Sequence, residues 1–351
     1  MPTPRSDDVR IEQAPGREPA ASHRPVGVRT ALLALAAAAL LLAAPAMLGP
    51  YWLRILSNIF MYAVLAQGIN LMAGYTGYPA FGNVVFYGLG GYVTAILMGK
   101  LQAPFALAVL ASAALCPLLV LVIGPPLLRL KGHYFAIATL GFNEAVKEIV
   151  SNMTSLTGGG MGVSLPLPPW GPVVSSVMFY YLFLGAMVVA TWVTFEFSRR
   201  RLGIACCAIR DNEEKAAAVG LHTTRYKTTA WMISATMTGF VGAINAYQMT
   251  YIDPPTVFDM AISVKSFVIF LLGGAGTVLG PVGGAFFVEL LQTFTWSKLL
   301  NWHLGAMGTI IILVVMLAPK GFREALRGMP SFAARRARSR RPSGAADTMR
   351  P

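Results

Sequence analysis

The chain has 351 residues, of which 55% are apolar and only 12% are charged, and its formal net charge is +13. Because an ordinary soluble domain carries about 25% charged residues, this composition excludes a soluble globular protein and makes the lipid bilayer the solvent of the fold. The positive charge does not indicate nucleic-acid binding, since 23 of the 28 Lys and Arg residues lie in four places: the two tails, residues 129–131 and residues 199–227.

Apolar runs long enough to cross a hydrocarbon core of about 30 Å recur along most of the chain. They lack the period-two alternation of a membrane β-barrel, so the spanning segments must be helical. We therefore predict an all-α, polytopic membrane protein of about ten transmembrane helices, at residues 30–48, 51–73, 80–99, 104–128, 133–150, 175–197, 228–250, 258–273, 279–295 and 304–318.

Two tails flank the predicted transmembrane domain of residues 30–318. Residues 1–29 are polar and rich in proline, which is typical of a disordered tail, and residues 319–351 form a basic tail. The sequence Ala44-Pro45-Ala46 resembles a signal-peptidase site, so cleavage of the first apolar segment is a competing interpretation.

The distribution of Lys and Arg predicts the orientation of the chain. Ten spans place both termini, residues 129–132 and residues 198–227 on one side, which the positive-inside rule identifies as the cytoplasm. The loop at 152–174 falls on the other side and contains no charge between Met153 and Val174. The weakest boundary lies within 258–295, where glycines interrupt one apolar stretch. We predict a tight cytoplasmic turn there, and a re-entrant pair of half-helices is the alternative.

A short internal repeat accompanies these glycines. Leu71-Met72-Ala73-Gly74, followed by Gly77 and Gly82, is echoed by Leu271-Leu272-Gly273-Gly274, followed by Gly276 and Gly280. Many transporters consist of two halves related by a pseudo-twofold axis, with the transport route between them. The pattern therefore predicts such an internal repeat.

Residues 198–227 form the one long charged insert between apolar segments. The insert contains seven basic residues, and Asp211 or Asn212 is placed to cap a helix whose first turn is acidic. Alanines 216–218 propagate this helix and Gly220 suits its end. The sequence predicts a short helix with a smooth alanine face that another protein can approach closely. A solvated connector between two spans is the simpler alternative.

Four segments of the chain resemble the permeases of branched-chain amino acid ABC transporters, of the LivM/LivH type. They are Asn70–Val93 (NLMAGYTGYPAFGNVVFYGLGGYV), Gly132–Gly162, Ala208–Lys227 (AIRDNEEKAAAVGLHTTRYK) and Leu271–Gly284 (LLGGAGTVLGPVGG). Together they cover most of residues 60–290 in the order of the family. One departure is Asn83, where His is expected in many relatives.

The resemblance implies a permease subunit of a binding-protein-dependent importer in the inner membrane, and not an enzyme. Its expected partners are a second, homologous permease, two cytoplasmic ABC ATPase subunits, a periplasmic or lipid-anchored substrate-binding protein and membrane lipids. The insert then acts as the coupling helix, with Arg210, Glu214, Ala217 and Gly220 transmitting motion. No phosphate loop of the form GxxxxGK[ST] occurs, so no cofactor is expected on this chain, and ATP and Mg²⁺ belong to the ATPases.

Two further sets of residues are candidates for the transport route. Polar side chains within membrane segments are costly and mark function by default, which singles out Asn70, Asn83, Glu144, Lys265 and Glu289; of these, Glu289 is expected to reach the outer interface. Glu144 and Lys265 either pair with each other across the bundle or meet the charged ends of a zwitterionic amino acid. Glycines that form a gate or a turn are the second set: Gly74, Gly77, Gly158, Gly159, Gly274 and Gly276.

Other functions remain as alternatives with less support. A stand-alone secondary transporter for amino acids or small amides needs repeated membrane carboxylates and no coupling helix. A membrane enzyme needs a catalytic set, and no paired His, nucleophile–base set or metal-ligand spacing is present. Cys116, Cys206 and Cys207 are expected to serve as small apolar residues. The residues do not decide between branched-chain amino acids, other amino acids, amides and urea as cargo.

Overall fold

The computed structural model describes residues 28–298, and two bodies can be distinguished within the chain. Residues 28–48 belong to one compact unit, and residues 49–298 belong to the other. In the first unit, α1 spans Val28–Met47, where the sequence predicts a helix at 30–48. Both tails and the predicted span at 304–318 lie outside the described residues.

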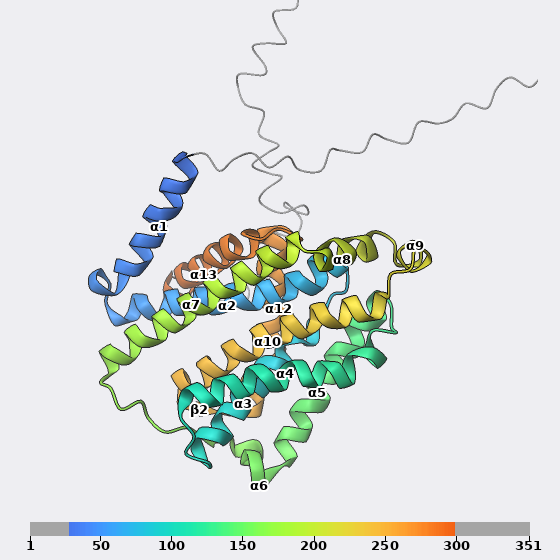
Figure 1. Cartoon of the computed structure of the whole chain (residues 1–351). Helices are drawn as coiled ribbons and strands as arrows, with labels where there is room; N and C mark the ends of the chain where they lie inside the picture. The colour runs from blue at the N-terminus through green and yellow to red at the C-terminus, as the bar shows by residue number, and fades with distance from the viewer. Residues whose placement is uncertain (1–27, 299–351) are drawn as a thin grey trace, which may run out of the picture. The chain divides into compact units, whose positions relative to one another are not determined.

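The second unit is built almost wholly of helices (Figure 1). Eight long helices coincide with the eight predicted spans between residues 51 and 295: α2 (Pro50–Ile69), α3 (Val84–Gly99), α4 (Phe105–Leu127), α5 (His133–Asn152), α7 (Pro172–Arg199), α10 (Thr223–Met249), α12 (Met260–Gly273) and α13 (Gly280–Lys298). Five helical stretches in the described part are long and apolar enough to cross a membrane: 50–76, 81–99, 105–127, 172–199 and 254–273.

Short elements occupy the links between these helices. They are the π-helical turn η1 (Asn70–Thr76), the 3₁₀ turns η2 (Phe81–Asn83) and η3 (Gly159–Met161), the helices α6 (Thr154–Thr157), α8 (Arg201–Asp211), α9 (Glu213–Ala218) and α11 (Pro254–Val257), and the strands β1 (Val163–Ser164) and β2 (Tyr251–Ile252). The strands pair antiparallel, with Val163 opposite Ile252. They are the only sheet among the described residues.

Helix α10 is the hub of the bundle. It packs against α2, α3, α4 and α7, and its Trp231 is 1% exposed. Glycines let it approach α3 closely, since a Cβ at Gly242 would lie 2.1 Å from the Tyr87 carbonyl oxygen and one at Gly90 would lie 2.2 Å from that of Gly239. The α3–α10 contact is therefore made backbone to backbone.

The links alternate between two ends of the bundle. At one end, α8 and α9 contact the α2–α3 link, the α4–α5 link and the α12–α13 turn. At the other end, the β1–β2 pair joins the α5–α7 and α10–α11 links, and Lys100 after α3 donates to the carbonyl of Ser155. Figure 1 shows α9 and β2 at opposite ends of α10. This alternation agrees with the predicted order of spans.

The chain makes a tight turn within 258–295, as predicted, while the cytoplasmic side of this turn stays a prediction. Helix α12 ends at Gly273, α13 begins at Gly280, and positive φ angles at Gly274 (+97°) and Gly276 (+74°) turn the chain between them. The turn lies next to Arg210 of α8. The turn also brings Gly276 beside Gly74, so the two repeated glycine motifs meet; the pseudo-twofold repeat itself stays a prediction.

The backbone contact between α3 and α10 makes a prediction about stability. Gly242→Ala should lower the free energy of unfolding by about 1–3 kcal/mol, the range for overpacking a core, because the Tyr87 backbone cannot move aside. Gly185→Ala in α7 is the matched control, since no atom lies within 4 Å of a Cβ there and alanine favours a helix. Unfolding of the detergent-purified proteins by heat or denaturant measures both. Equal stability of the two variants would contradict the close contact.

Candidate functional site

The charged insert folds into two helices with an extended residue between them. Helix α8 ends at Asp211, Asn212 takes φ −162° and ψ 105°, and α9 starts at Glu213. The Oδ1 atom of Asn212 accepts a hydrogen bond from the Lys215 amide at 2.9 Å, so Asn212 rather than Asp211 caps the predicted helix. Gly220, at φ +89°, follows its end. The separate helix α8 was not anticipated from the sequence.

One side of α9 is an exposed surface of small side chains. Ala216 is buried at 4% exposure, while Ala217, Ala218 and Gly220 are exposed and Val219 is 80% exposed. Small side chains permit the surface of a partner to approach the helix closely. The predicted alanine face is therefore accessible from solvent, apart from Ala216.

Arg210 joins α8 to the π-helical end of α2. Its Nη1 donates to the Gly74 carbonyl at 2.7 Å, and a π-helical turn leaves such a carbonyl without its usual α-helical partner. Gly77, at φ +76°, has room only for hydrogen, since a Cβ there would lie 2.9 Å from Arg210 Cγ. A Cβ at Gly276 would lie 3.4 Å from the Arg210 guanidinium. Arg210 therefore occupies a socket formed by Gly74, Gly77 and Gly276.

Asn70 connects this socket to the α12–α13 turn. Its Oδ1 accepts from the Gly276 amide at 2.9 Å, and its Nδ2 donates to the Thr277 carbonyl at 2.8 Å. Gln67, one turn earlier, donates to the Val278 carbonyl at 2.6 Å. The structure thus brings together Arg210, Asn70 and the glycines at 74, 77, 274 and 276, which the sequence selects for different reasons.

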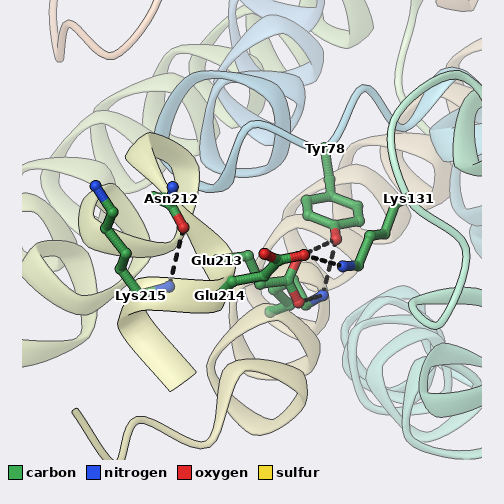
Figure 2. Close-up of polar contacts among 7 residues, drawn as sticks. Tyr78, Lys131, Asn212, Glu213, Glu214 and Lys215 are labelled. Atoms are coloured by element: carbon green, nitrogen blue, oxygen red, sulfur yellow. Dashed lines mark hydrogen bonds and ion pairs between the residues drawn. The ribbon is translucent and has the colours of Figure 1, made fainter. Parts of the chain in front are cut away.

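A buried lysine, Lys227, anchors α9 to the bundle through Tyr78 and Glu213, both of which are labelled in Figure 2. Lys227, in the second turn of α10, is 1% exposed. Its Nζ donates to Glu213 Oε1 at 2.6 Å, to the Tyr78 hydroxyl at 3.0 Å and to the Leu128 carbonyl at 3.3 Å. Tyr78 in turn donates to Glu213 Oε2 at 2.5 Å, and Lys227 also lies 4.2 Å from the centre of the Tyr78 ring. We call Tyr78, Glu213 and Lys227 the anchor cluster.

The neighbouring glutamate makes a much weaker contact. Glu214 pairs with Lys131 at 3.4 Å, and the two side chains are 85% and 65% exposed. A solvent-exposed ion pair contributes about 0–1 kcal/mol. Adjacent glutamates of α9 thus differ: Glu213 faces the bundle, and Glu214 faces solvent beside the small-residue surface.

The electrostatics of the anchor cluster follow from its geometry. Burial alone would raise the pKa of Glu213, but hydrogen bonds from Lys227 and Tyr78 and the positive charge of Lys227 outweigh it, so the pKa lies below its ordinary value. Burial, followed by the hydrogen bond to Glu213, raises the pKa of Tyr78. The cluster therefore holds a carboxylate and a neutral phenol at neutral pH.

Asn83 lies inside the bundle. Its Nδ2 donates to Ser234 Oγ and Thr238 Oγ1 of α10, both at 3.0 Å. A cavity beside Asn83 is also lined by Ser263 and Ser266 of α12. Its volume of about 10 Å³ is close to the smallest volume that holds one water.

The structure does not pair Glu144 with Lys265. Glu144 of α5 instead contacts Lys147 at 2.8 Å, one turn along the same helix, and its side chain is 47% exposed. Lys265 of α12 forms an ion pair with Glu289 of α13, in which the side chains are 13% and 8% exposed. Its Nζ lies 4.0 Å from the centre of the Tyr62 ring. Lys265 therefore joins α12, α13 and α2.

Gly158 and Gly159 lie at the end of the bundle opposite α9. Both have positive φ angles, +70° and +61°, and Gly158 closes the short helix α6. A Cβ at Gly158 would meet the Gly162 carbonyl at 2.1 Å. These two glycines are thus required by a tight turn.

The cysteines give no sign of a metal site. Cys116 and Cys206 are buried, and burial raises the pKa of the Cys206 thiol to about 12, which keeps it protonated and unreactive. Within residues 28–298, no group of three His, Cys, Asp or Glu side chains is arranged to hold a metal.

Comparison with known proteins gives one consistent result. The family model described as branched-chain amino acid transport system / permease component matches residues 51–318. The chain is 30% identical to the high-affinity branched-chain amino acid transport system permease protein LivM of Salmonella typhimurium, over 84% of this chain and 75% of that protein. It is 28% identical to LivM of Escherichia coli over the same shares, and 24% identical to LivH of S. typhimurium over 74% of this chain and 90% of LivH. No solved structure matches the chain significantly.

The lowered pKa of Glu213 predicts how stability depends on pH. A carboxyl group whose pKa is lower when folded stabilises the fold above its unfolded pKa of about 4.3, and this contribution is lost as pH falls through the folded pKa. Wild type should therefore lose stability relative to Glu213→Gln as pH falls below about 4.3. Thermal unfolding of both proteins in detergent, from neutral to acidic pH, measures the difference. A stability difference that does not change with pH would contradict the ionised pair.

Proposed function

Since the chain belongs to the permease component family of branched-chain amino acid transport systems, we propose that it is the multi-pass inner-membrane subunit of an importer for branched-chain amino acids. The importer's two cytoplasmic ABC ATPases bind ATP and Mg²⁺, a second, homologous permease completes the membrane part, and a binding protein outside the membrane delivers substrate. The observation that carries the proposal is α9, whose exposed small-residue surface is joined through Arg210 to two membrane segments.

The charges of the described links support a cytoplasmic position for α9. At its end lie Arg129, Lys131, Arg200, Arg210, Lys215 and Arg225, whereas the links at the opposite end carry Lys100 together with Asp253 and Asp259. Lys and Arg accumulate in cytoplasmic loops. By the predicted order of spans, both termini are then also cytoplasmic.

In the proposed mechanism, an ATPase subunit binds the exposed surface of α9. Glu214, Ala217 and Gly220 take part in this contact, and Arg210 carries the movement inward. Through the Gly74 carbonyl and Asn70, a displacement of α8 and α9 reaches the end of α2 and the α12–α13 turn. The glycines of the socket permit the close contacts through which this movement passes. Gly158 and Gly159 form a tight turn at the opposite end of the bundle. In this proposal that end faces the outside of the cell and belongs to the outer gate.

The transport route is proposed to run beside Asn83, Glu144 and Lys265, with Asn70 at its cytoplasmic end. Glu144 supports this best, because a half-exposed carboxylate on a membrane helix must face protein or water and not lipid. The open side of α5 therefore faces the second permease or the route between the two subunits. A stand-alone secondary transporter is not favoured, since the relatives are permease proteins of transport systems.

Enlarging the small-residue surface tests the docking. Ala217→Trp should abolish the stimulation of ATPase activity by substrate and binding protein without unfolding the permease, because an indole on α9 holds the ATPase away. Val122→Trp on the exposed side of α4 is the control, since Val122 is 74% exposed. Reconstituted complexes provide the readout. Normal stimulation of the Ala217→Trp complex would remove α9 from the mechanism.

Neutralising the membrane charges tests the route. Glu144→Gln and Lys265→Met should each reduce substrate uptake into proteoliposomes. Lys265→Met also leaves Glu289 unpaired in a buried site, so the double variant Lys265→Met/Glu289→Gln separates a loss of charge from a loss of folding. Wild-type uptake by both Glu144→Gln and the double variant would exclude these residues from an essential route.

A further inference from the structure

Lys227 is the exception among the basic residues of the insert. Six of the seven, namely Arg199, Arg200, Arg201, Arg210, Lys215 and Arg225, are exposed, whereas Lys227 is 1% exposed. Its three ammonium hydrogens match three acceptors from three separate segments: α9, the α2–α3 link and the end of α4. Both carboxylate oxygens of Glu213 are also used. The anchor cluster is thus a fully satisfied ionic network, in which the Lys227 side chain is 2% exposed and the Glu213 side chain is 22% exposed.

Without this network, α9 would have freedom to turn. The helix has only six residues, and isolated helices shorter than about 12 residues are marginal in water. It is bounded by Asn212, which is extended, and by Gly220, whose φ is +89°. Ala216 is its only buried residue, and Glu213 is partly exposed. The position of such a segment therefore depends on the side chains that attach it to the bundle.

We propose that Tyr78, Glu213 and Lys227 are positioning residues of coupling: they hold α9 in one orientation against α10, the end of α4 and the α2–α3 link, so that movement imposed on α9 reaches the hub helix. This inference rests on the proposed docking of an ATPase on α9. The anchor cluster adds a second connection between α9 and the bundle. The first connection, through Arg210, leads to α2 and the α12–α13 turn.

The chemistry of the cluster favours positioning over stability. Replacing both partners of a buried ion pair by neutral groups is often neutral for stability, whereas removing one partner is strongly destabilising. In the anchor cluster, both carboxylate oxygens of Glu213 are bound, the ammonium of Lys227 has three acceptors, and the phenol of Tyr78 lies between them. Together these contacts fix the orientation of α9 as well as its distance from the bundle. A neutral double variant can therefore keep the fold and lose the orientation of α9.

The test uses the complete transporter, with both permeases, the ATPases and the binding protein, in proteoliposomes. The variants are Glu213→Gln/Lys227→Met and Tyr78→Phe, and Lys131→Met is the matched control because it removes the lysine from the exposed neighbour Glu214. Four properties are measured for each variant: thermal unfolding, co-purification of the ATPases, substrate-stimulated ATPase activity, and the amount of ATP hydrolysed per substrate molecule transported.

The double variant should unfold near the wild-type temperature and retain the ATPases, while substrate stimulation falls about tenfold, as expected for the loss of one charged hydrogen bond. Tyr78→Phe should show a smaller loss of the same kind, and Lys131→Met should match wild type. Wild-type coupling in the double variant, or an equal loss in Lys131→Met, overturns the inference. If the double variant does not assemble, normal coupling in Tyr78→Phe overturns it.

The same measurements separate this inference from the proposed function. If Ala217→Trp uncouples the transporter while the anchor variants do not, α9 docks an ATPase and only the positioning role fails. If Ala217→Trp leaves stimulation intact, the docking itself is wrong.

Discussion

A break in a membrane helix leaves amide groups that lipid cannot satisfy, and the arrangement around α9 follows from this constraint. The carbonyl of Gly74 in the π-helical turn accepts from Arg210, and that of Leu128, just past the end of α4, accepts from Lys227. At the α12–α13 turn, Asn70 satisfies one amide and one carbonyl. The same side chains that satisfy these groups also join the insert to the bundle, so the connections proposed for coupling arise where the helices end.

The two basic residues that hold the insert lead to different helices. Arg210 reaches the end of α2 and, through Asn70, the α12–α13 turn, whereas Lys227 belongs to α10 and contacts α4 and Tyr78. On the proposed function, one movement of the insert is divided between two groups of helices. A difference in how far each group moves would change the space between them, which is what a transport route requires.

Much of the fold could be predicted from the sequence, because hydropathy and helix-end signals are local. The eight long helices between residues 50 and 298, the helix capped by Asn212 and the turn after Gly273 all depend on residues close in sequence. The anchor cluster could not be predicted, since Tyr78 lies 149 residues from Lys227 and 135 from Glu213. Lys227 looked like one more cytoplasmic charge. The sequence likewise did not decide which residue pairs with Lys265, and in the structure this residue is Glu289 instead of Glu144.

The glycines between α3 and α10 limit which parts of the bundle can move. Where Gly90, Gly239 and Gly242 bring two main chains into direct contact, no side chains intervene to change rotamer and absorb a displacement. Sliding either helix by a fraction of a turn would drive a carbonyl into the backbone opposite. These two helices therefore behave as one stiff body, so a displacement of α10 carries α3 with it.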